Sequence, residues 1–354
     1  MSRKVLITGG AGFVGSSLGL GLKNRYPDWK IIALDNLKRR GSELNIPRLG
    51  DAGIEFVHGD VRNKSDLDPS LLNVDLILEC SAEPSVLAGY TSPGYVLETN
   101  LVGTINCLEL ARQTGAHFLF LSTSRVYPIS YLNALNYTET PTRFQLSDEQ
   151  SLPGVSGFGI SEDFPLDRAR SLYGTTKLAS ELIIAEYAEA YGLKTVIDRC
   201  GVLTGPWQMG KVDQGVFALW VANHYFKKSL KYIGYGGSGK QVRDFLHVAD
   251  LLDLIDIQIT HLDKFQGKTF NVGGGVDFSL SLYETTKLCQ EITGNVIPIE
   301  GVADNRTGDM PIFITDSRKV MEPSGWQPQR DGKTLISDLY EWIRQNERQL
   351  AGIF

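Results

Sequence analysis

Short apolar runs alternate along the chain with longer segments of helical periodicity. The runs predict strands at 5–8, 30–34, 54–57, 74–78, 117–121 and 195–197, the last of them in a strand that ends at Arg199. Continuous apolar runs are typical of parallel strands covered on both faces. Strands that alternate with helices indicate a parallel sheet between two helical layers. We therefore expect an α/β fold with a Rossmann-type doubly wound parallel sheet.

The first predicted strand runs directly into a glycine turn. Gly9, Gly12 and Gly15 are spaced GxxGxxG, one residue wider than the GxGxxG of the plain dinucleotide fingerprint. Phe13 and Val14 stand where a helix begins, and a helix N-terminus offers N–H donors and partial positive charge to a pyrophosphate. By itself, such a turn also occurs without a ligand.

A carboxylate ends the second predicted strand. Asp35 follows the run 30–34, and Asn36 comes next. A carboxylate in this place accepts hydrogen bonds from both ribose hydroxyls and repels a 2′-phosphate, which favours NAD over NADP. The basic run 38–40 could hold such a phosphate, but with Asp35 present we interpret it as a solvated loop.

Polar and small residues follow the third and fourth predicted strands. Asp60, which precedes Val61, stands where an adenine amino group would be recognised, but it could equally cap a helix that begins near Ser65. Ser81 and Ala82 follow the fourth strand, at the sheet edge where open α/β folds bind ligands. We expect these residues at a cofactor site.

Asn100 lies inside a predicted long helix, 96–113. Asparagine is a mediocre helix former, and its amide needs a hydrogen-bond partner. Either Asn100 orients a catalytic lysine through water or it is a surface residue, and the sequence leaves both possibilities open.

Two segments contain residues suited to catalysis. Thr123 follows the fifth predicted strand, and Tyr173 and Lys177 lie four residues apart in a later helix, where they share one face. A nearby ammonium and a nicotinamide cation would lower the pKa of a phenol from its usual ~10. The Thr123 hydroxyl would bind the reacting oxygen. A YxxxK spacing alone also fits an ordinary amphipathic helix.

Taken together, these features resemble the extended, sugar-nucleotide-modifying branch of the short-chain dehydrogenase/reductase superfamily, the NAD-dependent epimerase/dehydratase family. The resemblance covers essentially all 354 residues. It implies NAD as the cofactor, with Thr123, Tyr173 and Lys177 as the catalytic residues. It also implies a homodimer or homotetramer in which helices near 96–113 and 171–191 pair.

Two later stretches narrow the resemblance. Asp213-Gln214-Gly215 and the run 239–247 most closely resemble CDP-paratose 2-epimerases. This implies a CDP-hexose inverted at C2 through a 2-keto sugar, with Ser124, Arg125 and Gln214 at the substrate. One departure is at 201–202, where many relatives place an asparagine or serine near the substrate phosphates.

Two arginines are candidates for binding the substrate diphosphate. Arg243 can fork onto a diphosphate, and Arg306 offers a second guanidinium. Either arginine could instead pair with a neighbouring carboxylate, Asp244 or Asp309.

Several other functions remain alternatives. A 4-epimerase acting on UDP- or dTDP-sugars would use the same three catalytic residues, a net dehydrogenase or reductase would consume free NAD(H), and a sensor would bind NAD without turnover. A 4,6-dehydratase is disfavoured, because dehydratases of this branch have an Asp-Glu pair as acid and base where this chain has Ser124 and Arg125.

The order of the segments predicts two domains. Residues 1–199 plus about 241–262 would form the NAD-binding Rossmann domain, and about 200–240 plus 263–354 a smaller C-terminal α/β substrate-binding domain. The segment between Tyr127 and Tyr173 is rich in Pro, Gly, Ser and Asp, and we expect it to cover the substrate.

Composition limits the partners. The net charge is −6 without a basic block, which disfavours nucleic acid. The absence of an apolar run near ~20 residues and of a signal peptide favours a cytoplasmic protein without a membrane span. Cys80, Cys107, Cys200 and Cys289 are far apart and the five histidines are scattered, so we expect buried thiols and no metal.

Overall fold

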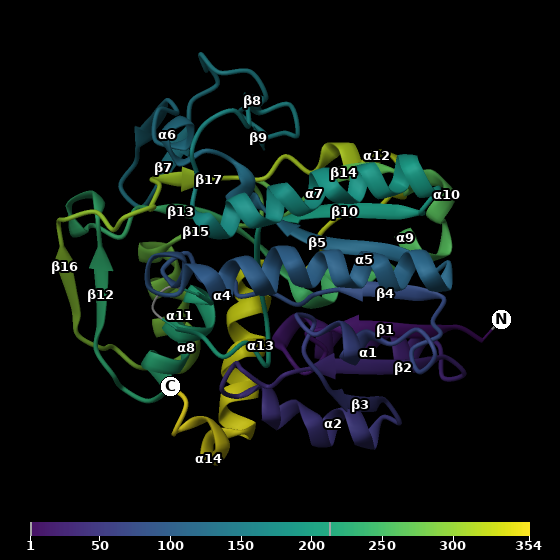
Figure 1. Ribbon diagram of the computed structural model, residues 1–354. Coiled ribbons are helices and arrows are strands. Elements are labelled where there is room, and N and C mark those ends of the chain that lie inside the picture. The colour runs from purple at the N-terminus through teal and green to yellow at the C-terminus, as the bar shows by residue number, and fades with distance from the viewer. Residues whose placement is uncertain (1, 212–213) are drawn as a thin grey trace. The chain divides into compact units, whose positions relative to one another are not determined.

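Two units make up the folded chain, and the computed structural model describes residues 2–211 and 214–354 (Figure 1). Unit 1 comprises Met1–Val126, Leu172–Arg199 and Leu251–Phe270, and unit 2 comprises Tyr127–Ser171, Cys200–Asp250 and Asn271–Phe354. The units differ from the predicted domains in three segments. Residues 127–171 and 241–250 are predicted in the NAD-binding domain but lie in unit 2, and residues 263–270 are predicted in the substrate-binding domain but lie in unit 1.

A seven-stranded sheet organises unit 1. Its order is β14-β10-β5-β4-β1-β2-β3, and the neighbours from β5 through β3 pair in parallel. The strands are β1 (Lys4–Thr8), β2 (Lys30–Asp35), β3 (Glu55–His58), β4 (Leu76–Glu79), β5 (His117–Thr123), β10 (Thr195–Cys200) and β14 (Lys268–Val272). The strand order reverses between β1 and β4, and open α/β sheets bind ligands at such a switch point.

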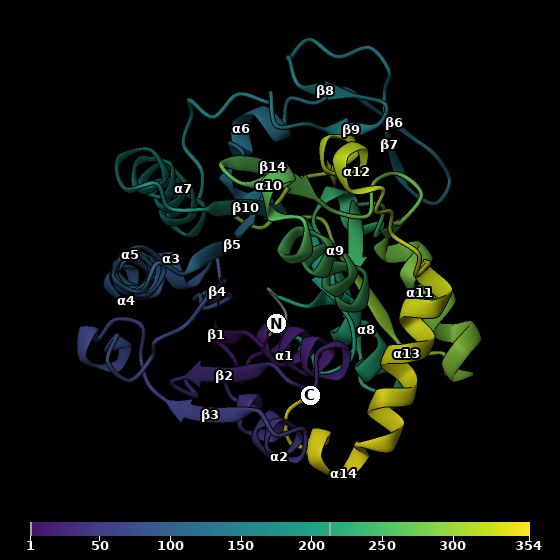
Figure 2. The same cartoon turned by 90° about the vertical axis from the view of Figure 1, so that its right-hand side faces the viewer.

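Helices cover both faces of this sheet. They are α1 (Phe13–Arg25), α2 (Asn45–Asp51), α3 (Ala88–Thr91), α4 (Pro93–Leu97), α5 (Gly103–Thr114), α7 (Leu172–Tyr191), α9 (Val248–Thr260) and α10 (Leu262–Phe265), with short turns η1 (Ser42–Leu44), η2 (Lys64–Leu67), η3 (Glu98–Val102) and η4 (Ser124–Val126). Figure 2 shows α5 and α7 on one side and α1 and α9 on the other. Phe118 of β5, Cys107 of α5 and Ile184 of α7 belong to one buried apolar cluster, which holds the α5–α7 layer on the sheet.

The doubly wound α/β fold predicted from the sequence is confirmed. The six predicted strands correspond to β1–β5 and β10, with ends displaced by two residues or fewer. The predicted uniform helix at 96–113 is wrong in detail. It begins earlier, as α4, and a π-helical turn, η3, interrupts it before α5 continues to Thr114.

Unit 2 contains smaller sheets. Its strands are β6 (Tyr137–Glu139), β7 (Phe144–Leu146), β8 (Val155–Ser156), β9 (Gly159–Ile160), β11 (Val202–Thr204), β12 (Leu230–Ile233), β13 (Val242–His247), β15 (Ser279–Ser281), β16 (Ile299–Val302) and β17 (Ile312–Phe313). Strands β11, β13 and β15 form one sheet with β17 paired to β13, while β12–β16, β6–β7 and β8–β9 are separate pairs. Its helices are α6 (Ile129–Leu132), α8 (Val216–Tyr225), α11 (Leu282–Thr293), α12 (Arg318–Ser324), α13 (Gly332–Gln345) and α14 (Glu347–Leu350), with the turn η5 (Tyr235–Gly237).

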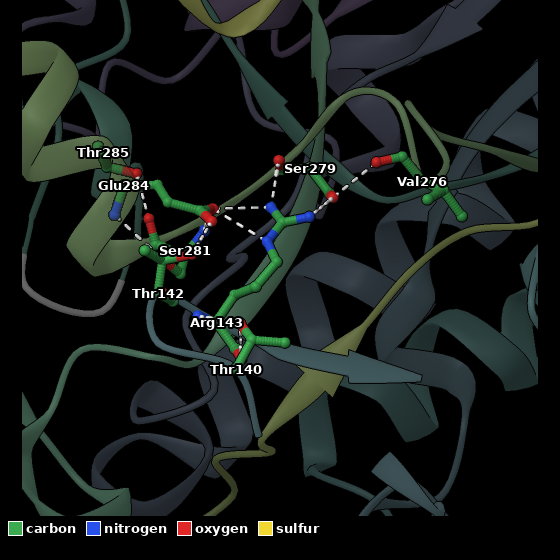
Figure 3. A network of polar contacts seen from close by, with 8 residues as sticks. All are labelled: Thr140, Thr142, Arg143, Val276, Ser279, Ser281, Glu284 and Thr285. Carbon is green, nitrogen blue, oxygen red and sulfur yellow. Dashed lines mark hydrogen bonds and ion pairs between the residues drawn. The ribbon is translucent and has the colours of Figure 1, made fainter. Parts of the chain in front are cut away.

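The segment 127–171 is held in place within unit 2. Arg143, in the turn of the β6–β7 hairpin, donates hydrogen bonds to Glu284 Oε2 at 3.0 and 2.8 Å and to the Ser279 carbonyl at 2.6 Å (Figure 3). Glu284 also closes a capping box with Ser281 at the start of α11. One carboxylate therefore starts the helix and anchors the hairpin. The predicted long loop thus contains ordered elements, while its role over the substrate stays a prediction.

Within the described residues, no helix combines the length and the apolar character needed to span a membrane.

Candidate active site

The glycine turn places the N-terminus of α1 at the carboxyl end of β1. Gly12 is the N-cap of α1 and has no side chain to bond the first-turn N–H groups. A Cβ at Gly9 would lie 2.9 Å from the Cα of Ser81, and one at Gly15 would lie 2.3 Å from the Gly9 oxygen. A Cβ at Gly12 would approach only Gly9, at 3.1 Å. Space therefore remains at this helix end, as a pyrophosphate requires.

Asp35 is fixed beside the same turn. Its side chain is 9% exposed, and its two oxygens accept hydrogen bonds from the N–H groups of Ala11, at 3.1 Å, and Leu37, at 2.8 Å. Burial raises the pKa of Asp35, while these backbone N–H groups oppose that rise. The structure thus joins the two halves of the predicted dinucleotide site.

Asp60 lies next to Asn36 at the ends of β3 and β2. Asn36 Nδ2 donates to Asp60 at 2.9 Å, and Arg62 Nη2 donates at 2.7 Å. The Arg62 guanidinium lowers the pKa of Asp60 to about 2. The helix-capping alternative is wrong, since Asn63 is the N-cap of the following turn. Val61 is buried. Adenine recognition by Asp60 stays a prediction.

Asn100 is fully buried in the π-helical turn, so the surface alternative is wrong. Its Oδ1 accepts from the Glu83 N–H at 2.7 Å, and its Nδ2 donates to the Glu83 carbonyl at 3.1 Å and to Thr176 Oγ1 at 3.3 Å. Asn100 therefore links the segment after β4, which contains Ser81 and Ala82, to helix α7. Its predicted role toward the lysine stays a prediction.

The three predicted catalytic side chains are all buried in unit 1. Thr123 ends β5 and is 8% exposed, while Tyr173 and Lys177 lie on the buried face of α7, at 9% and 2%. Helix α7 packs against β5 and η4. Thr123 Oγ1 accepts from the Arg125 N–H at 3.2 Å. The Lys177 ammonium lies 3.8 Å from the centroid of the Phe120 ring.

The predicted substrate residues are divided between the units. Ser124 and Arg125 form the start of η4 in unit 1, whereas Gln214, Arg243 and Arg306 belong to unit 2.

Within unit 2, the carboxylate pairing considered for the arginines is found for Arg243. Arg243 Nη2 donates to Asp309 Oδ1 at 2.8 Å, and the Asp309 N–H donates to the Arg306 carbonyl at 3.2 Å. Gln214 forms an isolated antiparallel β-bridge with Lys211 through the backbone. The intervening Val212 and Asp213 lie outside the described residues. Binding of a diphosphate by these arginines stays a prediction.

The buried carboxylates Glu79 and Glu181 could not be predicted from the sequence. Glu79, the last residue of β4, accepts from Ser81 Oγ at 2.8 Å and from Thr104 Oγ1 at 3.1 Å. Glu181 pairs with Arg199 at 2.7 Å. The sequence gives one signal for Glu79, which is a charged residue directly after the apolar run 74–78.

The thiols and the other metal-ligating side chains are dispersed. Cys107, Cys200 and Cys289 are buried as expected, whereas Cys80 is partly exposed. Within 2–211 and 214–354, no group of three or more His, Cys, Asp or Glu side chains could hold a metal ion.

Comparisons with known proteins place this geometry in context. Residues 5–273 match the model of the NAD dependent epimerase/dehydratase family. The chain is 32% identical to CDP-paratose 2-epimerase of Salmonella typhi, over 96% of this chain and 98% of that protein. It is 26% identical to dTDP-glucose 4,6-dehydratase of Streptomyces antibioticus, over 97% and 92%.

Among solved structures, the complex of Thermus thermophilus UDP-glucose 4-epimerase with NAD is similar, with a TM-score of 0.78 and 26% identity over 96% of this chain and 99% of that one.

Proposed function

Because the chain belongs to the NAD dependent epimerase/dehydratase family, we propose that it inverts C2 of a CDP-linked hexose, as in the conversion of CDP-paratose to CDP-tyvelose. The chain is an NAD-dependent enzyme whose relatives are sugar-nucleotide epimerases and dehydratases. The observation that supports the narrower proposal is the 32% identity to CDP-paratose 2-epimerase over almost the whole of both chains.

The residues of unit 1 fit NAD. The N–H groups at the start of α1 would bind the pyrophosphate, Asp35 the ribose hydroxyls, and Asp60 the adenine amino group. Lys177 would bind the nicotinamide ribose. Bound NAD would supply the chemistry of taking a hydride from the sugar ring and returning it.

A redox cofactor is needed for inversion at C2. In a nucleotide-linked sugar, C1 is an acetal carbon, so the hydrogen on C2 is not adjacent to a carbonyl and does not leave readily as a proton. Transient oxidation to a 2-keto sugar removes this barrier, because the planar carbon can be reduced from its other face.

The chain's own residues would move the proton. Tyr173, held as a phenolate by the Lys177 ammonium, accepts the proton of the sugar O2 and later returns it. Thr123 Oγ1 accepts from the Arg125 N–H. This bond leaves the Thr123 hydroxyl hydrogen available to donate to the reacting oxygen.

The second candidate is a 4-epimerase, which is supported by the similarity to the Thermus thermophilus UDP-glucose 4-epimerase. Dehydration is disfavoured for a chemical reason. Ser124 and Arg125 follow the catalytic threonine, and neither side chain provides the carboxyl acid and base that elimination across C5 and C6 needs.

The proposal includes the assembly. Helices α4 and α7 of unit 1 expose Leu97, Leu182 and Tyr191. Apolar side chains exposed on helices that the family resemblance pairs between subunits support self-association, and we propose a homodimer or homotetramer. The cytoplasmic location stays a prediction.

Product analysis tests the reaction. The protein is incubated with CDP-paratose, CDP-glucose, UDP-glucose and dTDP-glucose in parallel, and each product is identified by NMR. Inversion at C2 of a CDP-sugar supports the proposal. Turnover of UDP- or dTDP-sugars alone would replace it with the 4-epimerase, and a 4-keto-6-deoxy product would replace it with a dehydratase.

A further inference from the structure

Glu79 is the last residue of the buried strand β4 and carries a carboxylate. Its side chain is 0% exposed, and its two oxygens accept from the hydroxyls of Ser81 and Thr104. Two neutral hydroxyls do not offset the loss of hydration of an ionised carboxylate. A charged Glu79 therefore needs a cation close by.

The cation is provided by helix α7. Glu79 of β4 and Phe120 of β5 are partners in the parallel register, so their side chains lie on the same face of the sheet. The Lys177 ammonium lies over the Phe120 ring, at 3.8 Å from its centroid, and Lys177 is 2% exposed. The carboxylate and the ammonium thus share one buried layer. Burial raises the pKa of Glu79, and the Lys177 charge opposes that rise.

We propose that the Glu79 carboxylate is the buried counter-ion of the Lys177 ammonium and keeps this lysine charged and in place beside Tyr173. Glu79 is a positioning residue, which acts through Lys177 and does not touch the substrate. The importance of Lys177 for turnover rests on the proposed function, whereas the pairing itself does not.

Neither the thiols near Lys177 nor the carboxylate that follows it on α7 replaces this charge. Cys80 is partly exposed as a residue, but its thiol, like that of Cys107, is shielded from water near Lys177. This loss of hydration raises the pKa of both thiols, so they stay neutral. Tyr173 lies one turn before Lys177 on α7, and Glu181 one turn after it. Glu181 is already paired with Arg199 and accepts from Ser122.

The network also joins Glu79 to the predicted cofactor site. The Thr104 hydroxyl has one hydrogen, which is shared between Glu79 Oε2, at 3.1 Å, and the Asn100 carbonyl, at 2.8 Å. Ser180 Oγ lies 3.1 Å from the same carbonyl. Ser81, the second partner of Glu79, follows β4 at the switch point. A change at Glu79 is therefore expected to reach the cofactor site through Lys177 and these hydroxyls.

A double-mutant cycle on the protein without added cofactor tests the pairing. Glu79→Gln and Lys177→Met are made singly and together, and the melting temperature is measured for each. Removing one partner leaves the other charge buried and uncompensated, so each single variant melts lower, and the double variant recovers most of the loss. Glu181→Gln is the matched control, because it removes a buried carboxylate paired elsewhere, and adding Lys177→Met should not rescue it. Additive losses in the Glu79 cycle would overturn the proposal.

A second measurement follows Lys177 itself. Lysine labelled with carbon-13 at Cε is titrated by NMR, with the Lys177 signal assigned from its loss in Lys177→Met. In Glu79→Gln, the titration should move to lower pH by at least about one unit, while Glu181→Gln leaves it in place. An unchanged titration in Glu79→Gln would refute the pairing. Epimerisation that survives Tyr173→Phe would refute the proposed function instead, without affecting either result.

Discussion

Replacing Gly15 by alanine tests the cofactor cradle. A Cβ at this position would lie 2.3 Å from the oxygen of Gly9 and 2.9 Å from the Cα of Gly10, both of them backbone atoms. No side-chain rotation relieves that overlap, so the segments must separate by about 1 Å to reach the 3.4 Å at which ordinary contact begins. Overpacking of this kind destabilises a fold by about 1–3 kcal/mol. The same displacement moves the start of α1 away from the pyrophosphate.

Two assays measure the effect of Gly15→Ala. Urea unfolding followed by circular dichroism should show a lower midpoint. Loss of one hydrogen bond to a charged phosphate, about 1.5–3 kcal/mol, should weaken NAD binding at least about tenfold in calorimetry. Gly50→Ala in α2 is the control, since its Cβ meets nothing within 4 Å. Gly50→Ala should bind NAD normally, and its free energy of unfolding should rise by up to about 1 kcal/mol, because alanine favours a helix more than glycine does. Wild-type stability and NAD affinity in Gly15→Ala would refute this account of the turn.

Three further predictions concern the base, a buried acid and the assembly. Tyr173→Phe should retain NAD binding in calorimetry and lose turnover by roughly 10²–10⁴-fold, measured by product NMR; near-normal turnover would contradict the role as base. Burial raises the pKa of Asp198 from its ordinary 3.8 to about 7. The folded state therefore binds this proton more tightly than the unfolded state does. The resulting stabilisation of the fold is complete below pH 3.8 and is lost as the pH rises toward 7. In urea unfolding, the free energy of unfolding of Asp198→Asn should rise relative to that of the wild type by up to about 4 kcal/mol across this pH window. A difference between the two proteins that does not change with pH would exclude this effect. Leu182→Glu on α7 should lower the mass seen by light scattering, whereas Val296→Glu, on an 82% exposed residue, should not; an unchanged mass in both rules out pairing through α7.

Much of unit 1 could be predicted because its signals are local. Continuous apolar runs mark buried parallel strands, and the glycine turn and Asp35 stand at fixed places after the first two strands. The spacing of Tyr173 and Lys177 on one helix face needs only helical periodicity, and both side chains are buried on α7 as expected.

The parts that were missed depend on contacts between residues distant in the sequence. The short strands of 127–171 are only two or three residues long, too short for a periodic pattern, and Arg143 finds its partner Glu284 more than a hundred residues away. Asn100 is buried within a π-helical turn, which no propensity indicates. The environment of Glu79 could not be predicted, because it is created by residues of α5 and α7 that pack on the sheet.

The fate of the hydrogen on C2 is the most direct test of the proposed reaction. CDP-paratose deuterated at C2 is incubated with the protein in ordinary water, and the product is examined by NMR. The account predicts inverted C2 that still bears the deuterium, because the same hydride is returned to the opposite face. Inversion with loss of deuterium to the solvent, or a product altered only at C4, would contradict it.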